Sequence, residues 1–153
     1  MPDAAGDEEW MRRALAQAGR AKAAAEVPVG AVLVAPDGAV FEDYNRTRER
    51  NDPTAHAEVL VIRAAAAHRG DWRLEGHALY VTLEPCAMCA GAIVLARVPL
   101  LVYGADDPKT GMCGSLANLV ADPRLNHEAE VRRGVLAAEC GALLRDFFRA
   151  RRA

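Results

Sequence analysis

Two short segments decide how this chain is organised: residues 53–58, with the sequence PTAHAE, and residues 84–89, with the sequence EPCAMC. Together they supply one imidazole, one carboxylate and two thiols. Two thiolates and a neutral imidazole form a three-ligand set that favours zinc and leaves the fourth tetrahedral position for a water molecule. Zinc makes such a water acidic enough to yield hydroxide near neutral pH. The two segments therefore predict a hydrolytic zinc centre.

The residue types suggest a role for each side chain. Ligand softness favours His56 over Glu58 as the partner of the two cysteines, although the spacing by itself leaves this choice open. Glu58 is then the candidate for moving protons beside the metal. A structural zinc site or a redox pair is the alternative interpretation of Cys86 and Cys89. Cys113 is a less favoured candidate for a fourth ligand that would close the site.

Both segments have the features of helix starts. Residues 55–67 are rich in helix formers, and Asp52 and Thr54 are available as caps. Cys86 and Cys89 are three residues apart, so a helix places them on one face. A helix N-terminus also favours the thiolate form that metal binding requires. We therefore expect two helix starts to converge on one ion.

Strands and helices alternate along the chain, which predicts a layered α/β domain with parallel strands in its middle. Because both motif helices follow strands, we expect the site at the C-terminal ends of the strands. Asp7 is the expected cap of the first helix. The expected helices cover residues 7–26, 55–67, 86–96 and 136–152, and the expected strands cover residues 27–34, 39–44, 78–82, 100–103 and 129–135.

Composition limits the kind of protein this is. A length of 153 residues predicts a single domain, residues 1–153, with residues 1–6 as a loose tail. No apolar run is long enough to span a membrane, and the acidic N-terminus does not resemble a secretory signal. Four cysteines form no disulfide framework, so we expect a reducing, cytoplasmic location. The net charge of −2 argues against a generally basic nucleic-acid binder and leaves room for a local basic patch.

Two loop regions are candidates for ligand contact. Asn45 follows a predicted strand and is either a turn residue or an amide that reads the edge of a base. Residues 104–115, with the sequence GADDPKTGMCGS, are too polar and glycine-rich for regular structure. They form either a solvated loop or an active-site rim that supplies Asp106, Asp107 and Lys109.

The C-terminal helix also allows two interpretations. Its arginines serve either helix-dipole complementation and solubility, or contact with phosphates, with Phe147 or Phe148 available to stack a base. Cys140 lies among Leu and Ala in this helix and is expected to be a buried thiol. His127 is expected to be a turn or surface residue. The arginines concerned are Arg145, Arg149, Arg151 and Arg152.

These motifs together resemble the bacterial tRNA-specific adenosine deaminases of the cytidine-deaminase-like fold family, whose signature is H-x-E followed by P-C-x-x-C. The resemblance covers residues 10–152 and includes EVPVGAV at 26–32, DPTAHAE at 52–58, TLEPCAMCAGA at 82–92 and DFFR at 146–149. It implies a three-layer α/β/α fold with a mixed five-stranded sheet, one Zn²⁺ per chain, a homodimer and a tRNA anticodon stem-loop as partner. The implied reaction is zinc-dependent hydrolytic deamination of the wobble adenosine to inosine, with zinc-bound hydroxide as the nucleophile.

Residue by residue, the resemblance implies His56, Cys86 and Cys89 as zinc ligands and Glu58 as the proton shuttle. It implies substrate-binding side chains at Asn45, against the purine edge, and at Asp107, Lys109, Asn126, Phe148 and Arg149, on the anticodon-loop surface. Two other functions remain open. A deaminase of free bases or nucleosides would turn over those small molecules. A zinc-stabilised binding module would keep its function without the Glu58 carboxylate.

Overall fold

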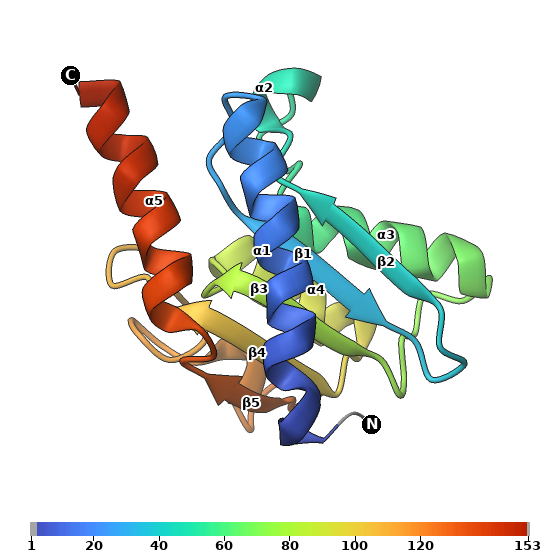
Figure 1. Cartoon of the computed structure of the whole chain (residues 1–153). Helices are drawn as coiled ribbons and strands as arrows, with labels where there is room; N and C mark the ends of the chain where they lie inside the picture. The colour runs from blue at the N-terminus through green and yellow to red at the C-terminus, as the bar shows by residue number, and fades with distance from the viewer. Residues whose placement is uncertain (1–2, 153) are drawn as a thin grey trace.

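A mixed five-stranded sheet lies at the centre of the computed structural model, which describes residues 3–152 (Figure 1). The strand order is β2-β1-β3-β4-β5. β1 runs antiparallel to β2 and β3, whereas β3, β4 and β5 are parallel. The prediction of a mixed sheet with parallel strands in its middle is therefore confirmed. The strands are β1 (Gly30–Val34), β2 (Val40–Tyr44), β3 (Ala78–Leu83), β4 (Leu100–Ala105) and β5 (Glu130–Arg133).

Helices cover both faces of this sheet, which gives the predicted three-layer fold (Figure 1). α1 (Asp7–Ala23) and α5 (Ala137–Arg152) pack on one face, and α3 (Ala57–Arg69) and α4 (Ala87–Ala96) on the other. Alternation along the strands divides the core: Leu79 faces α3 and α4, and the next residue, Tyr80, faces α1. Both faces are buried, which is why β1, β3 and β4 are continuous apolar runs. The short helical segments are η1 (Ala4–Gly6), α2 (Thr47–Arg50) and η2 (Leu119–Ala121).

The structure corrects the predicted end of the first helix. α1 stops at Ala23, and Ala25 then takes a left-handed conformation with φ of 62°. Glu26 is buried, and its carboxylate accepts hydrogen bonds from the backbone N–H groups of Arg48 (3.1 Å) and Glu49 (2.7 Å). The side chain assigned to the helix thus anchors α2, a long-range contact that no local pattern indicates.

The predicted cap of α1 and the predicted start of β1 were also wrong, although α1 begins at Asp7 as predicted. Gly6, rather than Asp7, is the N-cap of α1, and Asp7 is buried in an ion pair with Arg132 at 3.2 Å. The part of the predicted loose tail that the structure describes includes η1, and residues 1–2 lie outside the described residues. β1 begins at Gly30 instead of residue 27, and an added Cβ there would overlap the Ala14 carbonyl of α1. β5 is likewise shorter than the predicted residues 129–135.

This topology brings two helix starts to the same end of the sheet. α3 and α4 begin beside the end of β3, and the start of β1 lies there too because β1 is antiparallel to β3. Within residues 3–152, no helix is long and apolar enough to cross a membrane. The end of the sheet where the motifs meet is therefore the expected location of a functional site.

Candidate active site

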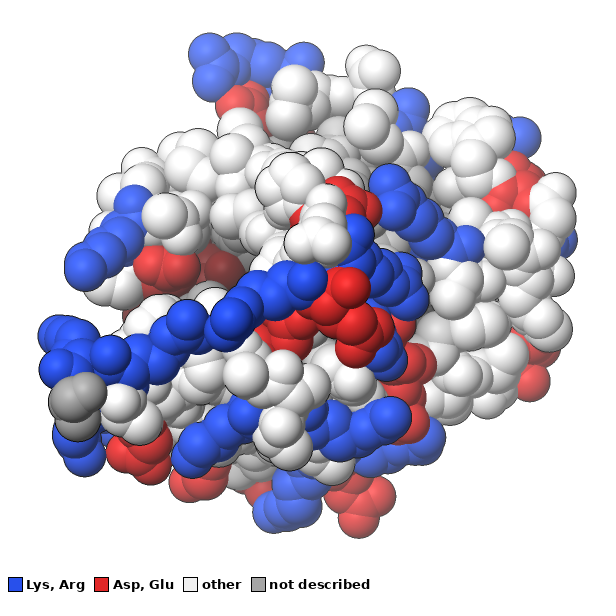
Figure 2. Space-filling view, turned by 90° about the horizontal axis from the view of Figure 1, so that it is seen from above, with Lys and Arg blue, Asp and Glu red and all other residues white. Residues whose placement is uncertain are grey.

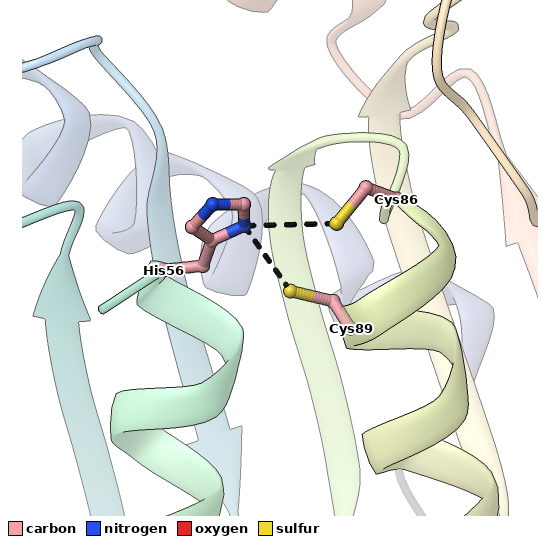
Figure 3. A group of neighbouring side chains, drawn as sticks. All are labelled: His56, Cys86 and Cys89. Carbon is pink, nitrogen blue, oxygen red and sulfur yellow. Dashed lines mark hydrogen bonds between the residues drawn. The ribbon is translucent and has the colours of Figure 1, made fainter. Parts of the chain in front are cut away.

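His56, Cys86 and Cys89 come together where α3 and α4 begin (Figure 3). His56 is the N-cap of α3, Cys86 is the N-cap of α4, and Cys89 lies in the first turn of α4. The His56 Nδ1 atom is 3.4 Å from Cys89 Sγ and 3.7 Å from Cys86 Sγ. One ligand atom from each residue lies within 4.8 Å of the others. Two helix starts thus converge on one point, as the sequence predicts.

The electrostatics of this cluster suit a cation. Hydrogen bonds with the Cys89 and His56 side chains lower the pKa of Cys86 to about 3. The hydrogen bond with the Cys86 sulfur and burial raise the pKa of Cys89, and repulsion from the Glu58 and Cys86 charges adds to this shift. The hydrogen bond with Cys86 raises the pKa of His56. A bound divalent cation would relieve the repulsion and favour both thiolates with a neutral imidazole.

Glu58 has the environment of a proton carrier. It lies in the first turn of α3 and is 4% exposed, and its Oε1 atom has no hydrogen-bond partner among the described residues. Burial raises its pKa, which favours the protonated form. Buried carboxylate oxygens are rarely left unpaired, so this one calls for a partner such as a bound water. Together with one nitrogen and two sulfur donors, it fits a catalytic zinc site.

Three residues of this site, His56, Glu58 and Cys86, line a pocket of about 240 Å³, and Cys89 is fully buried beside them. The ends of β2, β3 and β4 and the segment before β1 all contribute to its wall. Asn45 is buried there, and its Oδ1 accepts the backbone N–H of Ala57 at 3.0 Å. Since that acceptor is occupied, the amide NH₂ is the part of Asn45 left for a ligand. The lining residues are Val27, Val29, Asn45, Thr47, His56, Glu58, Leu83, Glu84, Cys86, Asp107 and Thr110.

Asn45 also replaces the helix caps that the sequence suggested. Asp52 does not cap α3; its Oδ1 accepts the N–H and the hydroxyl of Thr54 and so forms the turn before the helix. The first N–H of α3 is bonded instead to Asn45, 12 residues earlier. A cap that is supplied by another element leaves no signal in the residues next to the helix start, so the sequence did not indicate this one.

Beside the pocket lies a second hollow, a groove between the segment after β4 and α5. Asp107 and Thr110 line both cavities, so the groove adjoins the pocket. Lys109 and Phe148 line the groove, and Phe148 is 45% exposed, whereas Phe147 is buried. Of the two phenylalanines considered for base stacking, Phe148 is therefore the accessible one. Seen from above, Lys and Arg side chains gather in bands across the molecule with acidic side chains between them (Figure 2).

The structure distinguishes among the C-terminal arginines. Arg151 and Arg152 line the groove with Phe148. Arg149 is not part of that lining; it is exposed and lies 3.6 Å from Asp146 on its own helix. The sequence alone does not distinguish these arginines, because their positions relative to the pocket depend on how α5 packs on the sheet.

Asn126 lies away from the other predicted contact residues. It is exposed in the loop before β5. The next residue, His127, is hydrogen-bonded through Nε2 to the Val98 carbonyl (2.7 Å), and Glu130 donates to the Pro99 carbonyl (2.9 Å). These contacts place the loop near the starts of β4 and β5, whereas the pocket lies near their ends.

The other two cysteines are buried free thiols. Cys113 is 1% exposed and does not belong to the metal-ligating group found among the described residues, so it is not placed as a fourth ligand. Burial raises its pKa to about 12. Cys140 is buried in α5 against β4, as predicted for a thiol in a packed helix.

Comparison with known proteins identifies the class of this chain. Residues 5–105 match the cytidine and deoxycytidylate deaminase zinc-binding region, so the chain belongs to this family of zinc-dependent deaminases. A tRNA-specific adenosine deaminase of Bacillus subtilis (strain 168) is 51% identical over 143 residues, covering 94% of this chain and 89% of the relative. A tRNA-specific adenosine deaminase of Haemophilus influenzae is 49% identical over 149 residues, covering 95% and 85%. These relatives place the chain in the family of tRNA-specific adenosine deaminases.

Solved structures agree with this placement. A structure from a study of A-to-I editing by tRNA:A34 deaminases at the wobble position has a TM-score of 0.84 and 48% identity, covering 89% of this chain and 99% of that one. A guanine deaminase from Nitrosomonas europaea has a TM-score of 0.79 at 25% identity, covering 92% and 83%. Deaminases of RNA and of free bases thus share this fold.

Proposed function

We propose that this protein hydrolyses the wobble adenosine of a tRNA anticodon to inosine and ammonia, with one zinc ion per chain held by His56, Cys86 and Cys89. The observation that carries the proposal is the buried Oε1 of Glu58, which has no partner among the described residues, in the pocket that His56 and Cys86 also line. Cys89 completes the donor set within 4.8 Å. The relatives at 44–51% identity support the choice of tRNA as the substrate. The whole chain would act as one deaminase domain, in the cytoplasm, where tRNA is used.

When bound, zinc would lower the pKa of a water and so supply the nucleophile for C6 of adenine at neutral pH. The residues of the chain do the rest. Glu58 takes one proton from the attacking water and delivers it to the purine N1. The second proton of that water then goes by the same carboxylate to the amine, which leaves as ammonia. Its burial suits this task, because a raised pKa lets the carboxyl group hold a proton between the two transfers. The Asn45 amide NH₂ would donate to the purine edge and orient the ring.

The groove supports recognition of a single-stranded loop. An unpaired loop base is moved into a pocket at less cost than a base in a duplex. Phe148 would stack a neighbouring base, a contact worth about 1–3 kcal/mol. Lys109, Arg151 and Arg152 would face phosphates beside it, so the overall charge of −2 is no obstacle. Asp107, Asn126 and Arg149 remain predicted RNA contacts, the last two outside the groove lining.

We also propose that two copies pair through the outer face of α3 and α4. α4 carries no charged residue, and an apolar helix is stable in water only when another surface covers it. Yet Leu95 is 70% exposed on it, beside Trp72 at 59%. Both side chains line an apolar groove of about 630 Å³ between the two helices. A second copy of the chain would bury this face.

The test is inosine formation on an anticodon hairpin with a wobble adenosine, measured by nucleoside mass spectrometry. A hairpin with guanosine at that position and the Glu58→Gln protein are the negative controls, and free adenosine, cytidine and guanine are assayed in parallel. Inosine in the adenosine hairpin alone supports the proposal. Turnover of a free base or nucleoside without hairpin activity would instead assign the protein to small-molecule deamination.

A further inference from the structure

Glu84 is a buried carboxylate that the proposed reaction does not use. It is 2% exposed, and it lies two residues before the proposed zinc ligand Cys86. Its Oε1 accepts the backbone N–H of Asp107 at 3.0 Å and the hydroxyl of Ser115. Its Oε2 accepts the backbone N–H groups of Cys113 at 3.0 Å and Ser115 at 2.9 Å. All four donors come from the segment after β4.

These four bonds occupy the whole accepting capacity of the carboxylate, which is about four lone-pair positions. No position remains for a metal ion or a substrate proton. Although Glu84 is part of the pocket wall, its contacts are therefore with the protein itself. Its role is therefore to fix the position of the segment after β4, which supplies all four donors.

Glu84 holds the segment of residues 106–116, which we name the rim loop. Two backbone hydrogen bonds also join residues 84–85 to the end of β4 and to the rim loop. The Glu84 N–H donates to the Ala105 carbonyl at 2.9 Å, and the Met112 N–H donates to the Pro85 carbonyl at 3.0 Å. Gly111 passes so close that an added Cβ would overlap the Glu84 carboxylate. The rim loop is thus fastened to the strand end that leads into Cys86.

The rim loop contributes to both cavities. Asp107 and Thr110 line the pocket and the groove, and Lys109 lines the groove. Residues 106–110 of the loop are mostly exposed, whereas Cys113 is buried in the hydrophobic core and Met112 packs against it. The buried Glu84 carboxylate binds three backbone N–H groups of this loop, those of Asp107, Cys113 and Ser115.

From this geometry we infer that Glu84 is a positioning residue, which sets the rim loop relative to the metal-ligating motif and thereby sets affinity for the RNA loop. This inference rests on the proposed function for its substrate. The connection between Glu84 and the rim loop can be tested without any substrate. Loss of the carboxylate should loosen the loop, raise KM for the hairpin and leave kcat nearly unchanged.

The first test is limited proteolysis by trypsin, which cleaves after Lys109 in the rim loop. Glu84→Gln keeps the shape of the side chain but replaces one acceptor by a donor. Cleavage after Lys109 should become at least about fivefold faster relative to cleavage after the exposed Arg124. Ser115→Ala, which removes only the hydroxyl donor, should show a smaller increase and serves as the readout if Glu84→Gln does not fold. Wild-type cleavage rates after Lys109 in the folded variants would overturn the inference.

A matched control is Asp37→Asn. The Asp37 carboxylate likewise accepts a backbone N–H, that of Ala39 at 2.9 Å, but in the β1–β2 turn at the opposite end of the strands. This variant should match the wild type in cleavage after Lys109 and in kinetics. An equal effect of Asp37→Asn would show general loosening and would also contradict a specific role for Glu84.

The second test is steady-state kinetics on the hairpin with zinc content measured alongside. For Glu84→Gln, KM should rise about tenfold while kcat stays within about threefold, and zinc should remain at one per chain. Ser115→Ala should also raise KM. Ser115→Thr, which restores a hydroxyl, should return KM most of the way to the wild-type value. A fall in kcat or in zinc content at unchanged KM would overturn the inference. If the wild type is inactive on the hairpin, the proposed function fails, and proteolysis still decides the structural connection.

Discussion

Glu58 combines two properties that a purely structural carboxylate does not combine: burial, and an oxygen that has no partner within residues 3–152. Glu58→Gln keeps the size of the side chain and removes its ability to carry a proton. We expect inosine formation to fall by about 10³-fold or more. Zinc content and the thermal unfolding temperature should stay close to wild type. Activity within tenfold of wild type would contradict the assigned role and favour a binding module.

The metal-ligand assignment can be tested at single thiols. Cys86→Ala should lose both bound zinc and activity, because two remaining donors bind the ion far more weakly. The control is Cys140→Ala, which removes a buried thiol of α5 that lies outside the cluster. That variant should keep one zinc per chain, as measured by elemental analysis. Full zinc occupancy in Cys86→Ala would overturn the ligand assignment.

At the scale of the element, the start of α3 depends on Asn45, whose Oδ1 accepts the Ala57 N–H. Asn45→Ala should reduce the free energy of unfolding by about 1 kcal/mol, as loss of a helix cap does, and should also reduce activity. Asn45→Asp keeps the acceptor but lacks the NH₂ donor. It should recover stability in urea unfolding without recovering inosine formation. Full activity of Asn45→Asp would exclude donation from this amide to the purine.

α5 allows a comparison between two arginines on one helix. Arg152 lines the groove, whereas Arg149 pairs with Asp146 outside its lining. Arg152→Ala should weaken hairpin binding and reduce the slope of log affinity against log salt concentration by about 0.7, the value for one phosphate contact on a single strand. Arg149→Ala should weaken binding less. The measurement is a fluorescence titration at several salt concentrations, and equal effects would refute the placement of the groove.

At the scale of the whole molecule, the outer face of α3 and α4 should determine the oligomeric state. Leu95→Glu places a charge in the middle of that face and should convert a dimer to a monomer in sedimentation velocity. Leu125→Glu is the matched control, because Leu125 is also exposed, at 42%, but lies in the loop before β5. A monomeric wild type, or a dimer that tolerates Leu95→Glu, would contradict pairing through this face.

Local patterns in the sequence were enough for most of the architecture. Strand and helix existence follows from apolar runs and helix formers within each segment, and the core strands and α5 lie where these patterns indicate. The boundaries failed where a distant partner decides them. Glu26 lies beyond the end of α1, and its carboxylate accepts a backbone N–H group of α2. Asp7 pairs with Arg132, 125 residues away. Neither partner is visible in a window of neighbouring residues.

By itself, the sequence determined the donor set, since a zinc site of this kind needs particular residue types at particular spacings. It also determined that Glu58 lies two residues after His56, at the same helix start. Only the tertiary structure decided which residues surround them. Asn45 and Glu84 have their partners on other elements, and the groove arginines share a cavity with the segment after β4. The packing of the sheet and helices sets which of these meet. The ligand chemistry is local, whereas the pocket is a property of the assembled fold.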